Sequence, residues 1–414
     1  MTGGKDRVGR RRVFYIPGYD PFHPRRYREL YRKEGAEQAR ICGYALTLRA
    51  GGPCEWQVTF AGDGAQVETR IEVLTWSDIV TASMGHSIGA TYGQLVRTAW
   101  IYLASGALFR LARLRKGPTI AALYPIAVLL LQAGVALAAG WGLSIILSHV
   151  MAVAGPMLGR DVPAVATTAL GLAIGAAFAF LLLRWFRRQD SRIFAWYLMH
   201  DYAFTASAGG AVPADLRPRL AAFADRIAAA LAEDWDEVLV VGHSSGAHLA
   251  VSVLADLIRG GRVPAAGPAL GFLSLGQVVP MVSFLPGAHD LRADLAFLST
   301  RDELAWVDVT APGDGCAYAL CDPVAVSGAT PPGKRWPLVV SAAFTQTLSP
   351  ERWKALRWRF FRLHFQYLCA FDRPGDYDYF RITAGPLTLA ARYRGRTPSK
   401  SRIETPLNPY GRAA

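Results

Sequence analysis

A serine lies between two glycines where an apolar segment gives way to a helical pattern. Residues 242–246, Gly-His-Ser-Ser-Gly, match the pattern G-x-S-x-G, with VLVV before them and AHLAVSVLADLI after them. At such a junction a strained turn between strand and helix lifts the serine hydroxyl into the cleft above the sheet, and side chains at the glycine positions would collide with neighbouring elements. The spacing therefore predicts that Ser244 presents its hydroxyl in a cleft, where it could attack an acyl group.

The same strand, turn and helix resemble the α/β-hydrolase fold of serine esterases and lipases. The resemblance extends over residues 11–91 and 213–390, and it implies that Ser244 is the nucleophile of an acyl transfer. It also implies that the backbone N–H of Ser245 is one donor of the oxyanion hole. The alternative is a strand-to-helix turn in a sheet without catalytic activity.

A serine hydroxyl is a weak nucleophile at neutral pH, so a base must take its proton and a carboxylate must orient that base. In the hydrolase family the order along the chain is nucleophile, acid, histidine. His364 is the only histidine after residue 289 and lies toward the C-terminal end of the domain. We therefore expect His364 to be the base, with a histidine on a partly buried helix face as the alternative.

The acid that orients this base should come from the loop after a late strand. Residues 306–324, WVDVTAPGDGCAYALCDPV, supply a strand followed by the letters PGD, so we expect Asp314 to be the acid. This segment also resembles the HPYDPVAYR-type segment of the DDHD-type intracellular phospholipases, although it lacks the Pro-Val after the aspartate. Two alternatives stay open: Asp308, within the expected strand, and Asp322, directly before a proline.

The loop after an early strand should supply a second oxyanion donor. Residues 13–19, VFYIPGY, place a glycine soon after an apolar run. We expect the backbone N–H of Gly18 or Tyr19 to complete the oxyanion hole. An ordinary Pro-Gly turn would explain the same letters.

Motifs and composition argue against several other classes of protein. No HExxH, P-loop or dinucleotide fingerprint occurs, so we expect neither a metal nor a cofactor. Five cysteines without a CxxC pair fit a reducing compartment and argue against a disulfide framework or a thiolate zinc site. The net charge is +13, but no basic stripe is interleaved with aromatics, so we expect no nucleic-acid partner. The sequence leaves the oligomeric state open.

Two stretches are apolar enough to cross a membrane. Residues 118–159 and 162–183 contain no Asp, Glu, Lys or Arg, whereas about 20 apolar residues suffice to span a bilayer core. We therefore expect two transmembrane helices, at about 118–150 and 162–186, with residues 151–161 between them on the far side.

Basic residues at the outer ends of these stretches set the expected topology. Lysine and arginine gather before the first stretch and after the second, at Arg110, Arg113, Arg115, Lys116, Arg184, Arg187, Arg188 and Arg192. Such flanks normally face the cytosol, where they act as topology signals and contact headgroups. The N-terminal apolar run covers only Val13–Ile16, so we expect no signal peptide. An integral protein of the inner or plasma membrane follows, with its catalytic domain on the cytoplasmic side.

Outside the apolar stretches, strand-like and helix-like segments alternate. Strands are expected within residues 12–16, 54–60, 69–76, 238–241, 270–279, 305–310 and 336–344, and helices at 25–40, 213–233, from 245 onward and near 350–370. This alternation predicts an α/β fold in which helices cover both faces of a mostly parallel sheet. We expect an α/β-hydrolase-like sheet interrupted by an inserted transmembrane helical hairpin.

The expected domain organisation follows from these segments. The first part of the hydrolase domain is residues 11–91, the inserted membrane region is 92–192, the second part is 193–390, and basic, poorly ordered tails are 1–10 and 391–414. Residues 92–116 should form an amphipathic helix at the membrane surface. Both halves of one sheet must lie on the same side of the bilayer, so the number of crossings must be even, and we expect two.

Together these features predict a membrane-anchored serine hydrolase with a Ser-His-Asp triad. A phospholipid, lysophospholipid or other lipid ester is the expected substrate, because an enzyme fixed at a bilayer meets acyl lipids at high local concentration. An acyltransferase or a thioesterase would use the same triad. A non-catalytic membrane protein that binds a lipid or a partner protein on a hydrolase fold is the alternative from another class.

Overall fold

The computed structural model of the protein describes residues 6–85, 87–157, 159 and 163–411. The chain forms two compact units. The sheet unit comprises Met1–Ala82, Ile101–Thr119 and Thr205–Ala414, and the helical unit comprises Ser83–Trp100 and Ile120–Phe204. The residues that the sequence assigns to chemistry all belong to the sheet unit, and most of both apolar stretches belongs to the helical unit.

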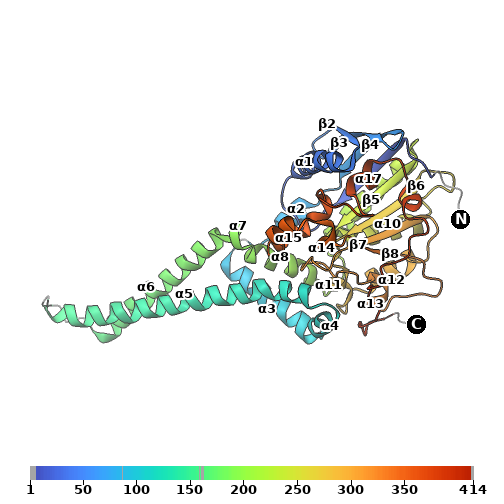
Figure 1. Ribbon diagram of the computed structural model, residues 1–414. Coiled ribbons are helices and arrows are strands. Elements are labelled where there is room, and N and C mark those ends of the chain that lie inside the picture. Colours follow the sequence, from blue (N-terminus) through green and yellow to red (C-terminus); the bar gives the residue numbers. More distant parts are fainter. Residues whose placement is uncertain (1–5, 86, 158, 160–162, 412–414) are drawn as a thin grey trace. The chain divides into compact units, whose positions relative to one another are not determined.

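One eight-stranded sheet organises the sheet unit (Figure 1). The strands lie in the order β2-β3-β4-β1-β5-β6-β7-β8. Neighbours from β4 to β8 are parallel, and the pairs β2–β3 and β3–β4 are antiparallel. Their bounds are β1 Arg10–Ile16, β2 Ala45–Ala50, β3 Glu55–Gly62, β4 Ala65–Val73, β5 Glu237–His243, β6 Ala269–Leu275, β7 Leu304–Thr310 and β8 Leu338–Ser341. The expectation of an α/β protein with a mostly parallel sheet is thus confirmed.

The central strands are buried on both faces, as expected for parallel strands covered by helices. On one face, Val13, Leu239 and Val241 join a core cluster that includes Tyr31 and Phe380. The other face of β5 packs against helices α9 and α10, and α10 in turn packs against α12. Because parallel strands end at the same edge of a sheet, the loops after β1, β5, β6 and β7 gather at the carboxyl edge.

Helices connect these strands. In the sheet unit they are α1 Arg25–Cys42, α4 Ala107–Leu114, α9 Leu216–Leu231, α10 Ser245–Arg259, α11 Val279–Ser283, α12 His289–Leu298, α13 Pro323–Val326, α14 Phe344–Thr347, α15 Pro350–Leu356, α16 Phe360–His364, the 3₁₀ helix η1 Gln366–Leu368, α17 Tyr379–Ala384 and α18 Leu389–Arg392. Those of the helical unit, or shared with it, are α2 Ser77–Ser83, α3 Ile88–Ala104, α5 Lys116–Met157, α6 Ala164–Arg188, α7 Asp190–Ile193 and α8 Ala195–Ala206.

Several expected elements differ in the structure. The single helix expected at 92–116 is two helices, α3 and α4, because Gly106 adopts a left-handed conformation with φ +67° between them. The helix expected near 350–370 is three short ones, α15, α16 and η1. Strand β2 was not expected; it lies at the sheet edge, where most of its side chains are exposed and the apolar pattern is weak.

The C-terminal tail is ordered over its described residues, contrary to expectation. Ile403 forms a bridge with Cys321. The side-chain amide of Asn408 donates hydrogen bonds to the carbonyls of Ser283 and Ser327, at 2.8 and 3.0 Å. At the other end of the chain, Arg7 forms a bridge with Leu387. These contacts, which sequence patterning does not reveal, hold both tails against the sheet unit.

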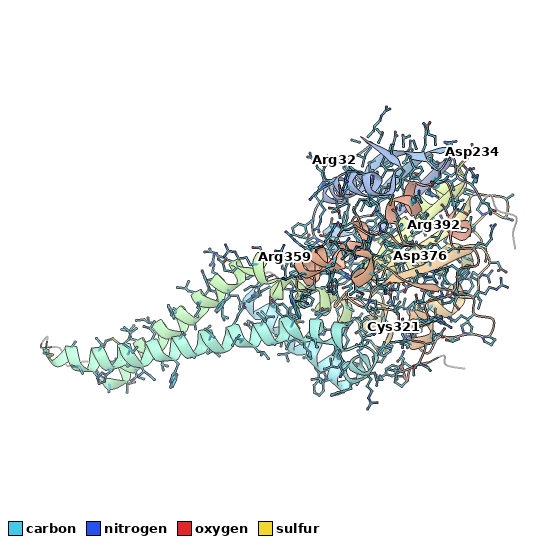
Figure 2. All side chains as sticks on the ribbon, viewed as in Figure 1. Arg32, Asp234, Cys321, Arg359, Asp376 and Arg392 are labelled. Carbon is cyan, nitrogen blue, oxygen red and sulfur yellow. The ribbon has the colours of Figure 1, made fainter. Side chains whose placement is uncertain are left out.

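Helices α5 and α6 are long and apolar enough to cross a membrane. Helix α5 extends beyond its expected span of 118–150 at both ends, whereas α6 begins two residues after and ends two residues after its expected span of 162–186. The expected turn residues Arg160 and Asp161 lie outside the described residues. Only 22% of the most apolar window of each helix is buried. Figure 2 shows their side chains projecting outward along most of their length. An exposed apolar surface of this length is typical of helices that meet lipid rather than a protein core.

Small residues bring α5 and α6 together. A Cβ added to Gly175 would lie 2.3 Å from the carbonyl oxygen of Gly140, and one added to Gly171 would lie 2.3 Å from Oγ of Ser148. No side chain fits in these gaps, so the two backbones touch directly. Close packing through small residues is how helices associate within a bilayer, where burial of apolar surface gives no advantage.

Candidate active site

The turn around Ser244 is strained and tightly enclosed. Ser244 adopts φ +57° and ψ −123° between β5 and α10. This backbone conformation is costly for a residue other than glycine and is concentrated at functional sites. A Cβ on Gly242 would lie 2.7 Å from the carbonyl oxygen of Gly246, and a Cβ on Gly246 would lie 2.0 Å from that of Ile16. Both flanking glycines are therefore required, as the sequence pattern predicted.

The loop after β1 lies against this serine. A Cβ on Gly18 would be 3.0 Å from Cβ and 3.4 Å from Oγ of Ser244. The loop is fixed from behind, because the indole N–H of Trp76 donates to the carbonyl of Pro17 at 3.0 Å, and the ring of Tyr19 packs edge-on against that indole. Gly18, one of the two residues expected to offer the second oxyanion donor, thus lies against the nucleophile turn. The choice between their N–H groups stays a prediction, as does the role of Ser245, the first residue of α10.

His364 and Asp314 meet in the interior of the sheet unit. Nδ1 of His364 lies 2.7 Å from Oδ2 of Asp314, and the two residues are only 6% and 2% exposed. The hydroxyl of Tyr367 donates to the same carboxylate oxygen at 3.1 Å, and the N–H of Cys316 donates to the other at 2.9 Å. Burial raises the pKa of Asp314, but the imidazole and these donors outweigh it and bring the pKa below its ordinary value. The carboxylate therefore stays ionised.

Gly276, directly after β6, links the histidine to the serine. The N–H of Ser244 donates to the carbonyl of Leu275 at 2.9 Å. A Cβ on Gly276 would lie 3.1 Å from Cε1 of His364 and 2.7 Å from the ring of Tyr367. Ser244 and His364 therefore contact neighbouring residues at the end of β6: Ser244 bonds to Leu275, and the imidazole of His364 lies against Gly276. All three expected triad residues lie at the carboxyl edge of the sheet.

His243 supports the backbone of His364. Nε2 of His243 lies 3.0 Å from the carbonyl oxygen of His364, and the two imidazole rings are 4.8 Å apart. Burial lowers the pKa of His243 to about 3, so the ring is neutral near pH 7 and its Nε2–H donates to the carbonyl. The residue directly before the serine thus fixes the segment that carries the expected base.

Asp308 has a different set of partners. It lies within β7 and is fully buried, and its Oδ1 accepts a hydrogen bond from the hydroxyl of Ser274 at 2.6 Å. Its Oδ2 has no hydrogen-bond partner among the described residues. Burial raises the pKa of Asp308 to about 8, so near pH 7 it is mostly a neutral acid. His364 takes Asp314 and not Asp308 as its carboxylate partner.

Asp322 has a structural part. Its side chain accepts the N–H groups of Val324 and Ala325 at the start of α13, both at 3.0 Å. Its other oxygen lies 2.5 Å from Nζ of Lys334. Capping and ion pairing therefore account for this carboxylate.

Sequence reasoning did not find Tyr367 or Gly276. The Tyr367 hydroxyl bridges two residues of the loop after β7, because it donates to Asp314 and also accepts the N–H of Ala311 at 2.9 Å. Its position three residues after His364 was a signal, since residues three apart on a helical turn face the same way. Gly276 follows an apolar strand, as Gly18 does, and this similarity could have been noticed in the sequence.

One group of possible metal ligands falls on this site. Ligand atoms of Asp314, Cys316 and His364 lie within 4.8 Å of one another. Both oxygens of Asp314 already accept hydrogen bonds, and one of them is shared with His364. The donor set therefore fits a hydrogen-bonded acid–histidine pair better than a metal centre.

Comparison of the chain with protein-family models, with curated proteins and with solved structures finds no match.

Proposed function

We propose that the protein is a membrane-anchored serine hydrolase that cleaves a carboxylic ester of a lipid. The observation that carries the proposal is the buried hydrogen bond of 2.7 Å between His364 and Asp314, at the same sheet edge as the strained Ser244 turn. An ionised acid fixed on Nδ1 selects the tautomer whose Nε2 can accept a proton, which a serine nucleophile requires. An α/β-hydrolase fold is part of this proposal, and the order of the parallel strands around β5 is compatible with it.

The proposed reaction has two halves. In the first, Oγ of Ser244 attacks the ester carbonyl while Nε2 of His364 takes the hydroxyl proton, and the resulting tetrahedral oxyanion rests on backbone N–H groups of Ser245 and of Gly18 or Tyr19. The alcohol then leaves with the proton from the imidazolium. In the second half, water attacks the acyl-serine, again giving its proton to His364, and the acid departs as Ser244 regains a proton. Asp314 stays ionised and stabilises the imidazolium.

The lipid part of the proposal rests on α5 and α6. Two apolar helices packed through glycines would hold the enzyme at a bilayer, with the sheet unit on the cytoplasmic side. Confinement to the surface that contains the substrate raises the local concentration of acyl lipids without any new contact. The arginines that flank the helix pair support this orientation.

Hydrolysis in vesicles tests the proposal. The full chain, reconstituted in phosphatidylcholine vesicles with lysophosphatidylcholine or diacylglycerol added, should release fatty acid, and Ser244→Ala should lose at least about 10⁴-fold of that rate. Ser252→Ala, a buried serine farther along α10, is the matched control and should keep most of the activity. Hydrolysis of p-nitrophenyl butyrate without any release from lipids would refute the lipid substrate, and full activity of Ser244→Ala would refute the nucleophile.

A further inference from the structure

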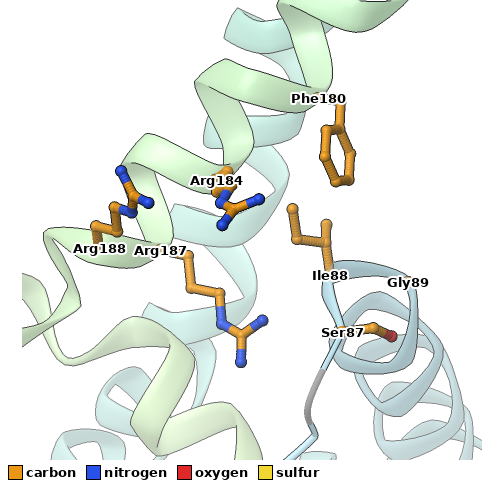
Figure 3. Close-up of a pocket in the computed structure, with 7 residues that line it drawn as sticks. All are labelled: Ser87, Ile88, Gly89, Phe180, Arg184, Arg187 and Arg188. Atoms are coloured by element: carbon orange, nitrogen blue, oxygen red, sulfur yellow. The ribbon is translucent and has the colours of Figure 1, made fainter.

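The helical unit contains a cationic pocket, none of whose lining residues belongs to the proposed active site. It has a volume of about 590 Å³ and lies between residues 87–89, where α3 begins, and residues 180–188, where α6 ends. Three arginines of α6 line it, together with Phe180 and Ile88. Figure 3 shows the guanidinium groups of Arg184 and Arg187 on the side of α6 that faces α3.

Two of the three arginines, Arg184 and Arg188, have no acidic partner among the described residues. Both are exposed. The nearest acid along the sequence, Asp190, is engaged elsewhere, because its carboxylate accepts the N–H groups of Trp196 and Tyr197 at 2.9 Å each. Two arginines beside a hollow, with no carboxylate to bind, are suited to an anion from outside the chain.

Other groups add to the preference for an anion. Arg187 is held in place by a hydrogen bond of 3.2 Å to the carbonyl of Gly85. Ser87 caps α3, since the N–H of Ala90 donates to its hydroxyl at 3.0 Å. The positive end of the 17-residue helix α3 therefore begins at the pocket wall. Guanidinium groups and a helix start therefore both line the pocket, and each is a kind of group that binds phosphate.

The pocket is also amphiphilic. The ring of Phe180, 53% exposed, lies two turns before the end of α6, on the side toward the apolar part of that helix. Arg184 follows one turn later and Arg188 two turns later. A ligand that fills this space would therefore meet arginines at one end and an apolar surface at the other. A free phosphate ion uses only the first, whereas a phospholipid uses both.

We propose that this pocket binds the phosphate of an anionic phospholipid at the level of the headgroups. The proposal is independent of Ser244 and requires only that α5 and α6 lie in a bilayer. Arginines placed where an apolar helix ends are at the depth at which lipid phosphates lie. Binding there would make the attachment of the helical unit sensitive to lipid composition.

Lipid binding to the full chain in neutral detergent, followed by native mass spectrometry, tests this proposal. The probes are phosphatidylglycerol and phosphatidylcholine with the same acyl chains. The wild type should bind phosphatidylglycerol about tenfold more tightly or better, because both lipids have a phosphate but the quaternary ammonium of phosphatidylcholine would bring a positive charge beside the arginines. The double variant Arg184→Gln/Arg188→Gln should lose this preference, because its affinity for phosphatidylglycerol should fall much more than its affinity for phosphatidylcholine.

The matched control is Arg113→Gln/Arg192→Gln, which removes the same charge from exposed arginines that do not line the pocket. It should keep the preference to within about twofold. Equal loss in both double variants would show a general charge effect and overturn the site. If an equal concentration of inorganic phosphate displaced phosphatidylglycerol, the proposal that the ligand is a lipid would be wrong. Binding should be the same in the Ser244→Ala background, so failure of the proposed hydrolase activity would not affect this result.

Discussion

Two buried carboxylates, one within β7 and one in the loop after it, differ in almost every respect except burial. Asp308 is 0% exposed and Asp314 is 2% exposed. Asp314 accepts hydrogen bonds from a histidine, a tyrosine and a backbone N–H, and its pKa is lowered. Asp308 accepts one hydroxyl, and burial raises its pKa to about 8.

This difference shows that donors, not depth, decide whether a buried acid carries charge. A carboxylate with three donors can stabilise an imidazolium, whereas a neutral acid cannot. Position adds a second reason. Asp314, in the loop after β7, lies beyond the sheet edge beside His364, whereas Asp308 lies within the strand. The proposed triad needs the loop acid, and the strand acid is a feature of the core.

The largest expected effect is on turnover in Asp314→Asn. An amide cannot stabilise the imidazolium and favours the wrong histidine tautomer, so ester hydrolysis should fall by about 10⁴-fold. Asp308→Asn is the control and should keep activity to within about threefold. Steady-state hydrolysis by both variants, with thermal unfolding to show that they fold, checks this. Loss of activity in Asp308→Asn with full activity in Asp314→Asn would reverse the assignment.

Asp308 should affect stability instead. Its folded-state pKa is raised, so its contribution to stability is complete below about pH 4 and is lost as the pH rises toward 8. The amide in Asp308→Asn is neutral at every pH, so the variant should not lose this stability. Its free energy of unfolding should exceed that of the wild type by about 1–3 kcal/mol at pH 8. Denaturant unfolding at pH 5 and pH 8 measures the difference. If the advantage of the variant in free energy of unfolding became smaller as the pH rises, Asp308 would not be a neutral acid in the folded protein.

Tyr367→Phe should give a smaller effect, on the loop acid alone. Its hydroxyl donates to Asp314 at 3.1 Å, and without it the carboxylate loses one of its three donors. The pKa of Asp314 should rise, and turnover should fall by about tenfold. The acid limb of kcat/KM should also move to higher pH, a change that simple loss of stability would not produce. Unchanged kcat/KM at every pH would show that the hydroxyl does not support the acid.

The smallest effect is expected for His243→Phe, which keeps a ring but removes the donor to His364. Because the folded-state pKa of His243 is lowered to about 3, its contribution to stability is complete above pH 6.5 and is lost as the pH falls toward 3. The melting temperature of the variant should therefore depend less steeply on pH between 6.5 and 4. An identical slope in the two proteins would mean that the ring is not held neutral.

The sequence allowed the main outline of the sheet unit to be predicted. The glycine pattern around Ser244 indicated β5, the turn and α10, because only glycine fits beside Ile16 and within the turn itself. The mostly parallel sheet followed from the alternation of strands and helices, and α5 and α6 followed from their uninterrupted apolar runs. Each of these features has a local cause, namely period, size or lack of charge.

Features that depend on distant contacts could not be predicted in this way. Asp308 and Asp314 lie six positions apart in one segment, and only His364 and Tyr367, some fifty residues later, distinguish them. The edge strand β2 is only partly buried on one face, at Leu46 and Leu48, and is exposed on the other. The ordered tail depends on its pairing with Cys321 and on the side-chain amide of Asn408, neither of which leaves a periodic signal.

Labelling with a fluorophosphonate probe tests the central claim most directly, that an activated Ser244 is oriented by His364 and Asp314. We expect a single adduct, mapped by peptide mass spectrometry to Ser244. It should be absent in Ser244→Ala, form much more slowly in Asp314→Asn and form at the wild-type rate in Asp308→Asn. A folded wild-type protein that stays unlabelled, or an adduct on another residue, would contradict it.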